Sequence, residues 1–309
     1  MDIKQKASLF AIASAFILAA SKFFVGQLSG SMAVASSGLD SLLDVFMSAM
    51  NFWAIRTAAQ PPDQFHQYGH GKAENLAAVF QSVVIIFTGS WIIYQAGQKY
   101  FLEAAIRYSR LDLGVMVLSL VFSFFISRVL GRVGRKTESS ALQADALHYT
   151  SDLYSNSAAI LAIIITHYTG RMAFDLLFAA VVGLIILFSA LQILKSGLFG
   201  LMDTRIPEPL ERQILDILGQ LSFPYAGYHK LRTRLSGNRK YLDFHLFICR
   251  KLNIDEAHAH TEKMEDKISE QIPNTDVLIH TEPCPYTCEL TDLTCCVKKI
   301  EIGISKGRV

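Results

Sequence analysis

Charged residues are scarce in this chain, and their charges nearly cancel. Asp, Glu, Lys and Arg make up 18% of the 309 residues, hydrophobic residues make up 51%, and the formal net charge is +2. This composition is too apolar for an ordinary soluble domain of this length. The chain also lacks the basic excess that is typical of nucleic-acid-binding proteins, so we expect no nucleic-acid partner.

Cysteine is absent until late in the chain. All five cysteines follow the last long apolar run, at Cys249, Cys284, Cys288, Cys295 and Cys296. An odd number of cysteines with such tight spacing does not resemble the disulfide framework of a small secreted protein. The pattern indicates a reducing compartment for this part of the chain.

Long apolar runs fill the chain up to about Leu201. Six of them reach the length of about 20 residues that a bilayer crossing requires, and they lie at 7–27, 31–57, 75–98, 111–135, 139–165 and 172–194. No small-residue cleavage site stands out after the first run, which we interpret as a membrane helix and not as a removed signal peptide. The second and fifth runs contain ionisable residues that lower their hydropathy. Their content of Ala, Ser and Leu still favours helices that face the interior of a bundle.

Basic residues are concentrated at alternate ends of these segments. Lys4 and Lys6 precede the first segment, Arg56 and Lys72 flank the connection between the second and third, and a cluster at 128–136 lies between the fourth and fifth. Because lysine and arginine are enriched in cytoplasmic loops, this bias predicts a multi-pass protein with both termini in the cytoplasm.

From Pro207 onward the chain has the composition of a soluble, charged domain. Apolar periodicity and turn residues predict, in order, a helix at 208–221, strands at 228–235 and 240–249, a helix at 255–271 and a strand at 276–280. The order α-β-β-α-β describes a small open-faced α/β domain. We therefore expect a transmembrane domain at 1–205, a cytoplasmic metal-binding domain at 206–283 and a cysteine-containing tail at 284–309.

Two pairs of ionisable residues lie inside the predicted second and fifth spans. Asp40 and Asp44 are four residues apart, as are His148 and Asp152, so each pair projects from one helix face. Ionisable groups within a bilayer cost several kcal/mol and usually mark a pathway or a site. At about 1.5 Å of rise per residue the two pairs lie at a similar depth, so antiparallel neighbouring helices would bring them together.

Three carboxylates and one imidazole would suit a four-coordinate zinc ion, and would tolerate cadmium, ferrous iron or manganese. The alternatives are polar residues that only pack the helices together, or a proton relay without metal.

Two further groups of candidate metal ligands lie outside the spans. Asp63, His66 and His70 occur within one short loop at spacings of three and four residues, and the spacing alone does not distinguish a metal site from a solvated loop. The predicted soluble domain contains His229, His245, His258, His260, His280 and Glu282. His280 and Glu282 share one strand face, but spacing does not show which of the others converge.

Taken together, these stretches resemble the cation diffusion facilitator family, and in particular its bacterial zinc/iron efflux branch. The resemblance extends over about 7–283 and rests on SMAVASSGLDSLLD (31–44), PPDQFHQYGHGKAE (61–74), ADALHYTSD (144–152), LMD (201–203) and HTEP (280–283). It implies a membrane α-helical bundle of six transmembrane helices, a metallochaperone-like cytoplasmic α/β domain and a homodimer in a bacterial inner membrane.

The resemblance also assigns roles to residues. Asp40, Asp44, His148 and Asp152 match the family's transport site, and Asp63, His66 and His70 match a loop site. His229, His245, His258, His280 and Glu282 match a cytoplasmic site at the dimer interface, although relatives often have Asp where this chain has Glu282. Lys72 and Asp203 match a salt bridge that interlocks the protomers. Asp145, one turn before His148, is expected to line the inner entrance to the transport site and not to bind the metal as a further ligand.

The function expected from these residues is proton-coupled export of divalent cations, Zn²⁺ first, by alternating access. Metal would displace protons from its ligands on binding, and histidine is the side chain that ordinarily titrates near neutral pH. Two alternatives stay open. A metal-gated channel or sensor would show no proton-dependent flux, and an intramembrane metalloenzyme would require a motif such as His-Glu-x-x-His, which the sequence lacks.

Overall fold

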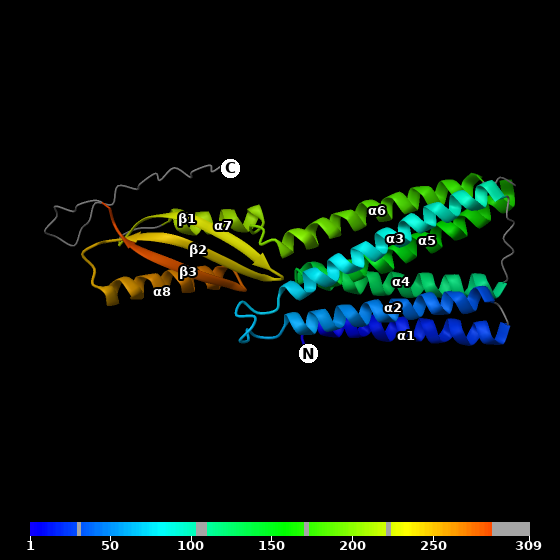
Figure 1. Ribbon diagram of the computed structural model, residues 1–309, viewed down its shortest axis with the longest axis horizontal. Coiled ribbons are helices and arrows are strands. Elements are labelled where there is room, and N and C mark those ends of the chain that lie inside the picture. The colour runs from blue at the N-terminus through cyan, green and yellow to red at the C-terminus, as the bar shows by residue number, and fades with distance from the viewer. Residues whose placement is uncertain (30–31, 103–109, 170–172, 221–223, 286–309) are drawn as a thin grey trace. The chain divides into compact units, whose positions relative to one another are not determined.

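The computed structural model describes residues 1–29, 32–102, 110–169, 173–220 and 224–285. The chain divides into two compact units, Met1–Leu201 and Met202–Val309. We call the first unit the bundle and the second the sheet domain (Figure 1).

The bundle consists of six long helices, which confirms the predicted membrane helical region. They are α1 (Ile3–Ser29), α2 (Met32–Ala58), α3 (Lys72–Leu102), α4 (Arg110–Lys136), α5 (Ser140–Thr169) and α6 (Ala173–Leu201). Helix α1 packs along α2, α4 along α5, and α3 along α6 (Figure 1). Within the described residues, four helical stretches are long and apolar enough to cross a membrane: Ile3–Val25, Lys72–Tyr94, Val117–Lys136 and Leu177–Leu201. These belong to α1, α3, α4 and α6, so the more polar α2 and α5 are the two that hydropathy misses, as expected.

The bundle buries polar side chains and exposes large apolar ones. Ser48, Asn51 and Gln81 have no exposed surface, whereas Phe16 and Phe188 are 60% and 65% exposed. In water this arrangement would be costly, but lipid solvates apolar side chains and leaves polar groups to pair inside the protein. The distribution is that of a bundle surrounded by lipid.

Helices approach closely where their residues are small. Ala7, Ala11 and Ala15 form a buried stripe on α1. Where α6 packs on α3, a Cβ added to Gly197 would lie 2.8 Å from Cγ2 of Val79. Glycine at this position therefore lets the two helix backbones approach more closely than any larger residue would.

One buried ion pair ties α1 to α3 at the end of the bundle where α1 begins. Lys4 Nζ lies 2.8 Å from Glu74 Oε1. The other oxygen of Glu74 accepts a hydrogen bond from the hydroxyl of Ser139, just before α5. Three segments distant in sequence are thereby joined through one carboxylate.

The sheet domain follows the predicted order of elements. It contains α7 (Glu208–Gly219), β1 (Tyr225–Ser236), β2 (Arg239–Ile248), α8 (Ile254–Gln271) and β3 (Thr275–Pro283). The strand order is β1-β2-β3, with β1 antiparallel and β3 parallel to β2. Each element lies within a few residues of its predicted range, so the predicted α-β-β-α-β order is confirmed.

The two helices cover one face of the sheet and leave the other open. Leu242, Phe244 and Leu246 of β2 are buried in the same apolar core as Ile214 of α7 and Ile268 of α8. Because successive side chains of a strand point to opposite faces, the side chains that alternate with this core project from the open face. The strand register places His229 beside His245 and His245 beside His280.

Candidate metal sites

The bundle brings Asp44, His148 and Asp152 together between α2 and α5. His148 Nε2 lies 2.9 Å from Asp44 Oδ1 and 3.9 Å from Asp152 Oδ2. One ligand atom from each of the three residues lies within 4.8 Å of the others, and all three residues are partly buried. A single nitrogen of His148 thus faces two carboxylates that come from different helices, which is an arrangement able to hold either a proton or a metal ion.

The side chain of Asp40 lies outside the described residues. The backbone of Asp40 belongs to α2, one turn before Asp44. Three of the four predicted transport ligands are therefore close together in the structure, and the participation of Asp40 stays a prediction.

Asp145 is separate from this group and fully buried. Its carboxylate accepts hydrogen bonds from Ser48 Oγ at 3.2 Å and from Gln81 Nε2 at 3.1 Å. The predicted entrance residue is thus enclosed by polar side chains in this conformation. Neither Ser48 nor Gln81 is among the residues predicted from the sequence, although an amide side chain in an otherwise apolar membrane helix, such as Gln81 in α3, is a local signal for such a role.

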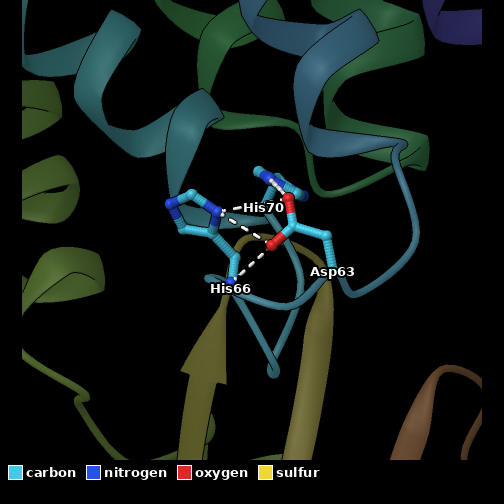
Figure 2. Close-up of side chains that lie close together, drawn as sticks. All are labelled: Asp63, His66 and His70. Atoms are coloured by element: carbon cyan, nitrogen blue, oxygen red, sulfur yellow. Dashed lines mark hydrogen bonds and ion pairs between the residues drawn. The ribbon is translucent and has the colours of Figure 1, made fainter.

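The loop between α2 and α3 gathers Asp63, His66 and His70 (Figure 2). Asp63 Oδ1 lies 3.2 Å from His66 Nδ1, and Asp63 Oδ2 lies 3.2 Å from His70 Nε2. The two imidazole ring centroids are 4.5 Å apart. The loop turns between the histidines at Gly69, whose φ of +79° favours glycine.

Hydrogen bonds from the loop backbone keep Asp63 ionised. The amide of His66 donates to Asp63 Oδ1 at 2.6 Å, and the amide of Phe65 donates to the same oxygen at 2.9 Å. These bonds, led by that of His66, lower the pKa of the Asp63 carboxyl group. Nδ1 of His70 is buried without a hydrogen-bond partner. The loop therefore presents an ionised carboxylate between two imidazoles, a set of donors that suits zinc.

The open face of the sheet carries a third group, made of His229, His245 and Glu282. Glu282 bridges the two histidines, with Oε2 2.9 Å from His229 Nε2 and Oε1 2.6 Å from His245 Nδ1. These two hydrogen bonds, led by that of His245, lower the pKa of Glu282 to about 2. From the edge strand β3, the side chain of Glu282 reaches His245 on the adjacent strand β2 and His229 on β1 beyond it.

The remaining predicted ligands of the sheet domain occupy different positions. His280 lies at the margin of the group, with Nε2 3.8 Å from Glu282 Oε1 and its ring centroid 4.6 Å from that of His245. His258 is exposed on α8, and the groups found among the described residues do not include it. A β-bulge after His229, where Lys230 has a φ of +52°, separates this group from the rest of β1.

Lys72 and Asp203 each make a hydrogen bond within their own unit. Lys72 Nζ donates to the backbone oxygen of Leu201 at 3.1 Å, and Asp203 Oδ1 accepts from Arg234 at 3.4 Å. The interlocking salt bridge between Lys72 and Asp203 stays a prediction.

Two family models together match most of the chain. The cation efflux transmembrane domain matches residues 8–202, and the cytoplasmic domain of cation efflux proteins matches residues 206–284. The chain therefore belongs to the cation efflux family, whose members are integral membrane proteins that transport cations.

Among its relatives are cation-efflux pumps named FieF. Those of Salmonella arizonae (strain ATCC BAA-731 / CDC346-86 / RSK2980) and Salmonella choleraesuis (strain SC-B67) are each 34% identical over 281 residues, which cover 91% of this chain and 93% of the pump. A solved chain described as the zinc transporter CzrB is 29% identical. That match covers 98% of the solved chain but 26% of this one, with a TM-score of 0.24.

Proposed function

We propose that this protein is a proton-coupled antiporter that exports divalent metal cations, with Zn²⁺ as the first substrate and Cd²⁺ or Fe²⁺ as further substrates. The observation that carries the proposal is the group of Asp44, His148 and Asp152 inside the bundle, with His148 Nε2 2.9 Å from Asp44 Oδ1. A metal and a proton compete for the same imidazole nitrogen, because that nitrogen must be deprotonated to bind metal. Asp40 would supply the fourth ligand.

Alternating access would couple this competition to transport. Metal arriving from the cytoplasm displaces protons from His148 and the carboxylates, and protons from the opposite side displace the metal after the helices have moved. The chain would lie in the inner membrane of a bacterium with both termini in the cytoplasm. It would act as a homodimer joined in part through its sheet domains, and the bridge between Lys72 and Asp203 would link the protomers.

The sheet domain would act as a cytoplasmic metal sensor. His229, His245 and Glu282 already lie within ligand distance of one another. His280 and His258 would complete the site when two protomers meet. The loop group of Asp63, His66 and His70 would bind a further ion near the membrane surface.

The test is zinc uptake into proteoliposomes with an imposed pH gradient. We expect the wild type to show gradient-driven flux. Asp44→Ala and His148→Ala should each reduce it about 100-fold, because each removes a ligand that the proton and the metal share. Glu270→Gln is the control, since this exposed side chain on α8 belongs to none of the three candidate metal groups.

The result also discriminates among the alternatives. Zinc flux that does not depend on the pH gradient would indicate a metal-gated channel. Zinc binding without any flux would indicate a sensor. Undiminished gradient-driven flux in His148→Ala would refute the assignment of the transport site. The sequence has no His-Glu-x-x-His motif, which disfavours an intramembrane metalloenzyme.

A further inference from the structure

A second polar cluster lies inside the bundle, one helical turn away from the proposed transport ligands. Ser48 follows Asp44 by four residues on α2, and Asp145 precedes His148 by three residues on α5. Both steps lead toward the end of the bundle where α1 begins. Asn51 of α2 and Gln81 of α3 complete the cluster, and none of its four residues has exposed surface.

The hydrogen bonds of this cluster have a fixed direction. The carboxyl group of Asp145 accepts a hydrogen bond from the amide nitrogen of Gln81, at 3.1 Å. The oxygen of the Gln81 side chain therefore faces Asn51, whose amide nitrogen donates to it at 2.5 Å. The two amide groups therefore form a chain of hydrogen bonds that ends on Asp145.

One acceptor is left over by this arrangement. The side-chain oxygen of Asn51 is buried and has no hydrogen-bond partner. Reversing the Asn51 amide would place its oxygen against the oxygen of Gln81, and reversing both amides would place the oxygen of Gln81 against Asp145. No orientation of the two amides satisfies every atom as long as Asp145 accepts the hydrogen bond from Gln81. A buried acceptor without a partner is costly, and such atoms are rare in proteins.

A cation would resolve this surplus, because it binds acceptors and requires no donor. Ser48 Oγ lies 3.2 and 3.3 Å from the two oxygens of Asp145 and 2.9 Å from the hydroxyl of Tyr149. Oxygen ligands about 2.1 Å from a small divalent ion stand about 3 Å from one another, so these separations match the edges of a coordination shell as well as hydrogen bonds. Rotation of the Asn51 and Gln81 amides would add their oxygens to that shell.

We propose that Asp145, Ser48, Asn51 and Gln81 form a second cation-binding position in the bundle, built from oxygen donors only. The position rests on the proposed function, since it would hold the ion on the path between the α1 end of the bundle and the Asp44–His148–Asp152 group. Carboxylate, amide and hydroxyl oxygens favour hard ions such as Mn²⁺, whereas the imidazole of His148 favours Zn²⁺. The two positions would therefore rank metals differently, and Asp145 would contribute to substrate selection.

The test is anomalous X-ray diffraction from crystals of the full-length protein soaked in Mn²⁺, measured on both sides of the manganese absorption edge. The wild type should show one anomalous peak within ligand distance of Asp145 and another near Asp44 and His148. Asp145→Asn, which preserves the shape of the side chain, should remove the first peak and keep the second. His148→Ala should weaken the second peak and keep the first.

Ser82→Ala is the matched control. Ser82 is as buried as Gln81, its neighbour on α3, but its hydroxyl donates to the backbone oxygen of Ala78, so this variant should retain both peaks. A wild-type peak at the transport ligands alone would overturn the inference, as would density beside Asn51 without anomalous signal, which identifies a water molecule. If zinc flux persists in that case, the proposed function stands without the second position. A manganese peak at Asp145 in a protein without proton-driven zinc flux would support the second cation position and refute the proposed function.

Discussion

A single carboxylate contacts histidines from all three strands on the open face of the sheet domain. Glu282 accepts hydrogen bonds from His229 and His245, which belong to two different strands, and His280 approaches the same carboxylate from its own strand. Hydrogen bonds to Glu282 therefore link β1 and β2 to β3 at the same atoms that would bind a metal ion. The same atoms must release those protons before metal can bind.

The depressed pKa of Glu282 predicts a defined pH dependence of stability. A carboxyl group whose pKa is lower in the folded state stabilises the fold above its unfolded value, and this contribution is lost as pH falls through the folded value. We therefore expect Glu282→Gln to lower the unfolding temperature of the sheet domain at pH 6. The difference from the wild type should shrink as pH falls from about 4.5 toward about 2.

The measurement is thermal unfolding of the metal-free protein, followed by the infrared amide band of β-strands. Glu270→Gln, at an exposed carboxyl group on α8, is the control and should show little difference at any pH. A Glu282→Gln deficit that stays constant down to pH 3 would mean that the side chain contributes by packing and not by its charge.

At the scale of elements, the close packing of α3 and α6 depends on glycine. An added Cβ at Gly197 would lie 2.8 Å from Cγ2 of Val79 and 3.3 Å from the backbone oxygen of Asn75. Valine has little rotamer freedom in a helix and a backbone atom cannot move aside, so the helices would have to separate. We expect Gly197→Ala to destabilise the bundle by about 1–3 kcal/mol.

Gly97→Ala provides the comparison on the facing helix. Gly97 also lies within a helix, α3, but an added Cβ there would meet no atom within 4 Å. Because alanine is the better helix former, this variant should be neutral or stabilising by up to about 1 kcal/mol. Thermal unfolding in detergent, followed by tryptophan fluorescence, measures both. Equal effects of the two substitutions would show that helix propensity, and not the α3–α6 contact, decides the outcome.

The sequence predicted the elements more completely than it predicted their contacts. Long apolar runs and strand alternation are local signals, so all six long helices and the α-β-β-α-β order followed from them. The approach of His148 to Asp44 could also be anticipated, because helical spacing and depth constrain both. The pairing of Asp145 with Ser48 and Gln81 could not, since three helices contribute to it and no local pattern encodes their rotation. The separation of His258 from the other histidines could not be predicted either, because it depends on how α8 packs on the sheet.

At the scale of the whole molecule, the two units can be observed separately. Both tryptophans, Trp53 and Trp91, belong to the bundle, whereas all three described strands belong to the sheet domain. Tryptophan fluorescence therefore reports on the bundle, and the infrared strand band reports on the sheet domain. This distribution allows the metal affinity of each unit to be measured in the intact protein.

Zinc should stabilise the two units through different ligands. A ligand present at 100 times its dissociation constant stabilises the folded state by about 2.7 kcal/mol. We expect zinc to raise both unfolding transitions and a chelator to reverse both shifts. His229→Ala should abolish the shift of the strand band and leave the fluorescence shift. His148→Ala should reduce the fluorescence shift, the loop group accounting for the remainder, and leave the shift of the strand band. If either variant abolishes both shifts, the two groups do not bind independently.

The ion pair between Lys4 and Glu74 has a consequence for the order in which the chain is assembled. Lys4 is synthesised well before its partner, which follows 70 residues later, and the hydroxyl of Ser139 follows a further 65 residues after that. Until α3 has been inserted, the ammonium group of Lys4 has neither Glu74 nor a buried environment, and its long side chain can extend to the aqueous interface. The amino-terminal helix therefore reaches its final position only after most of the bundle has been translated.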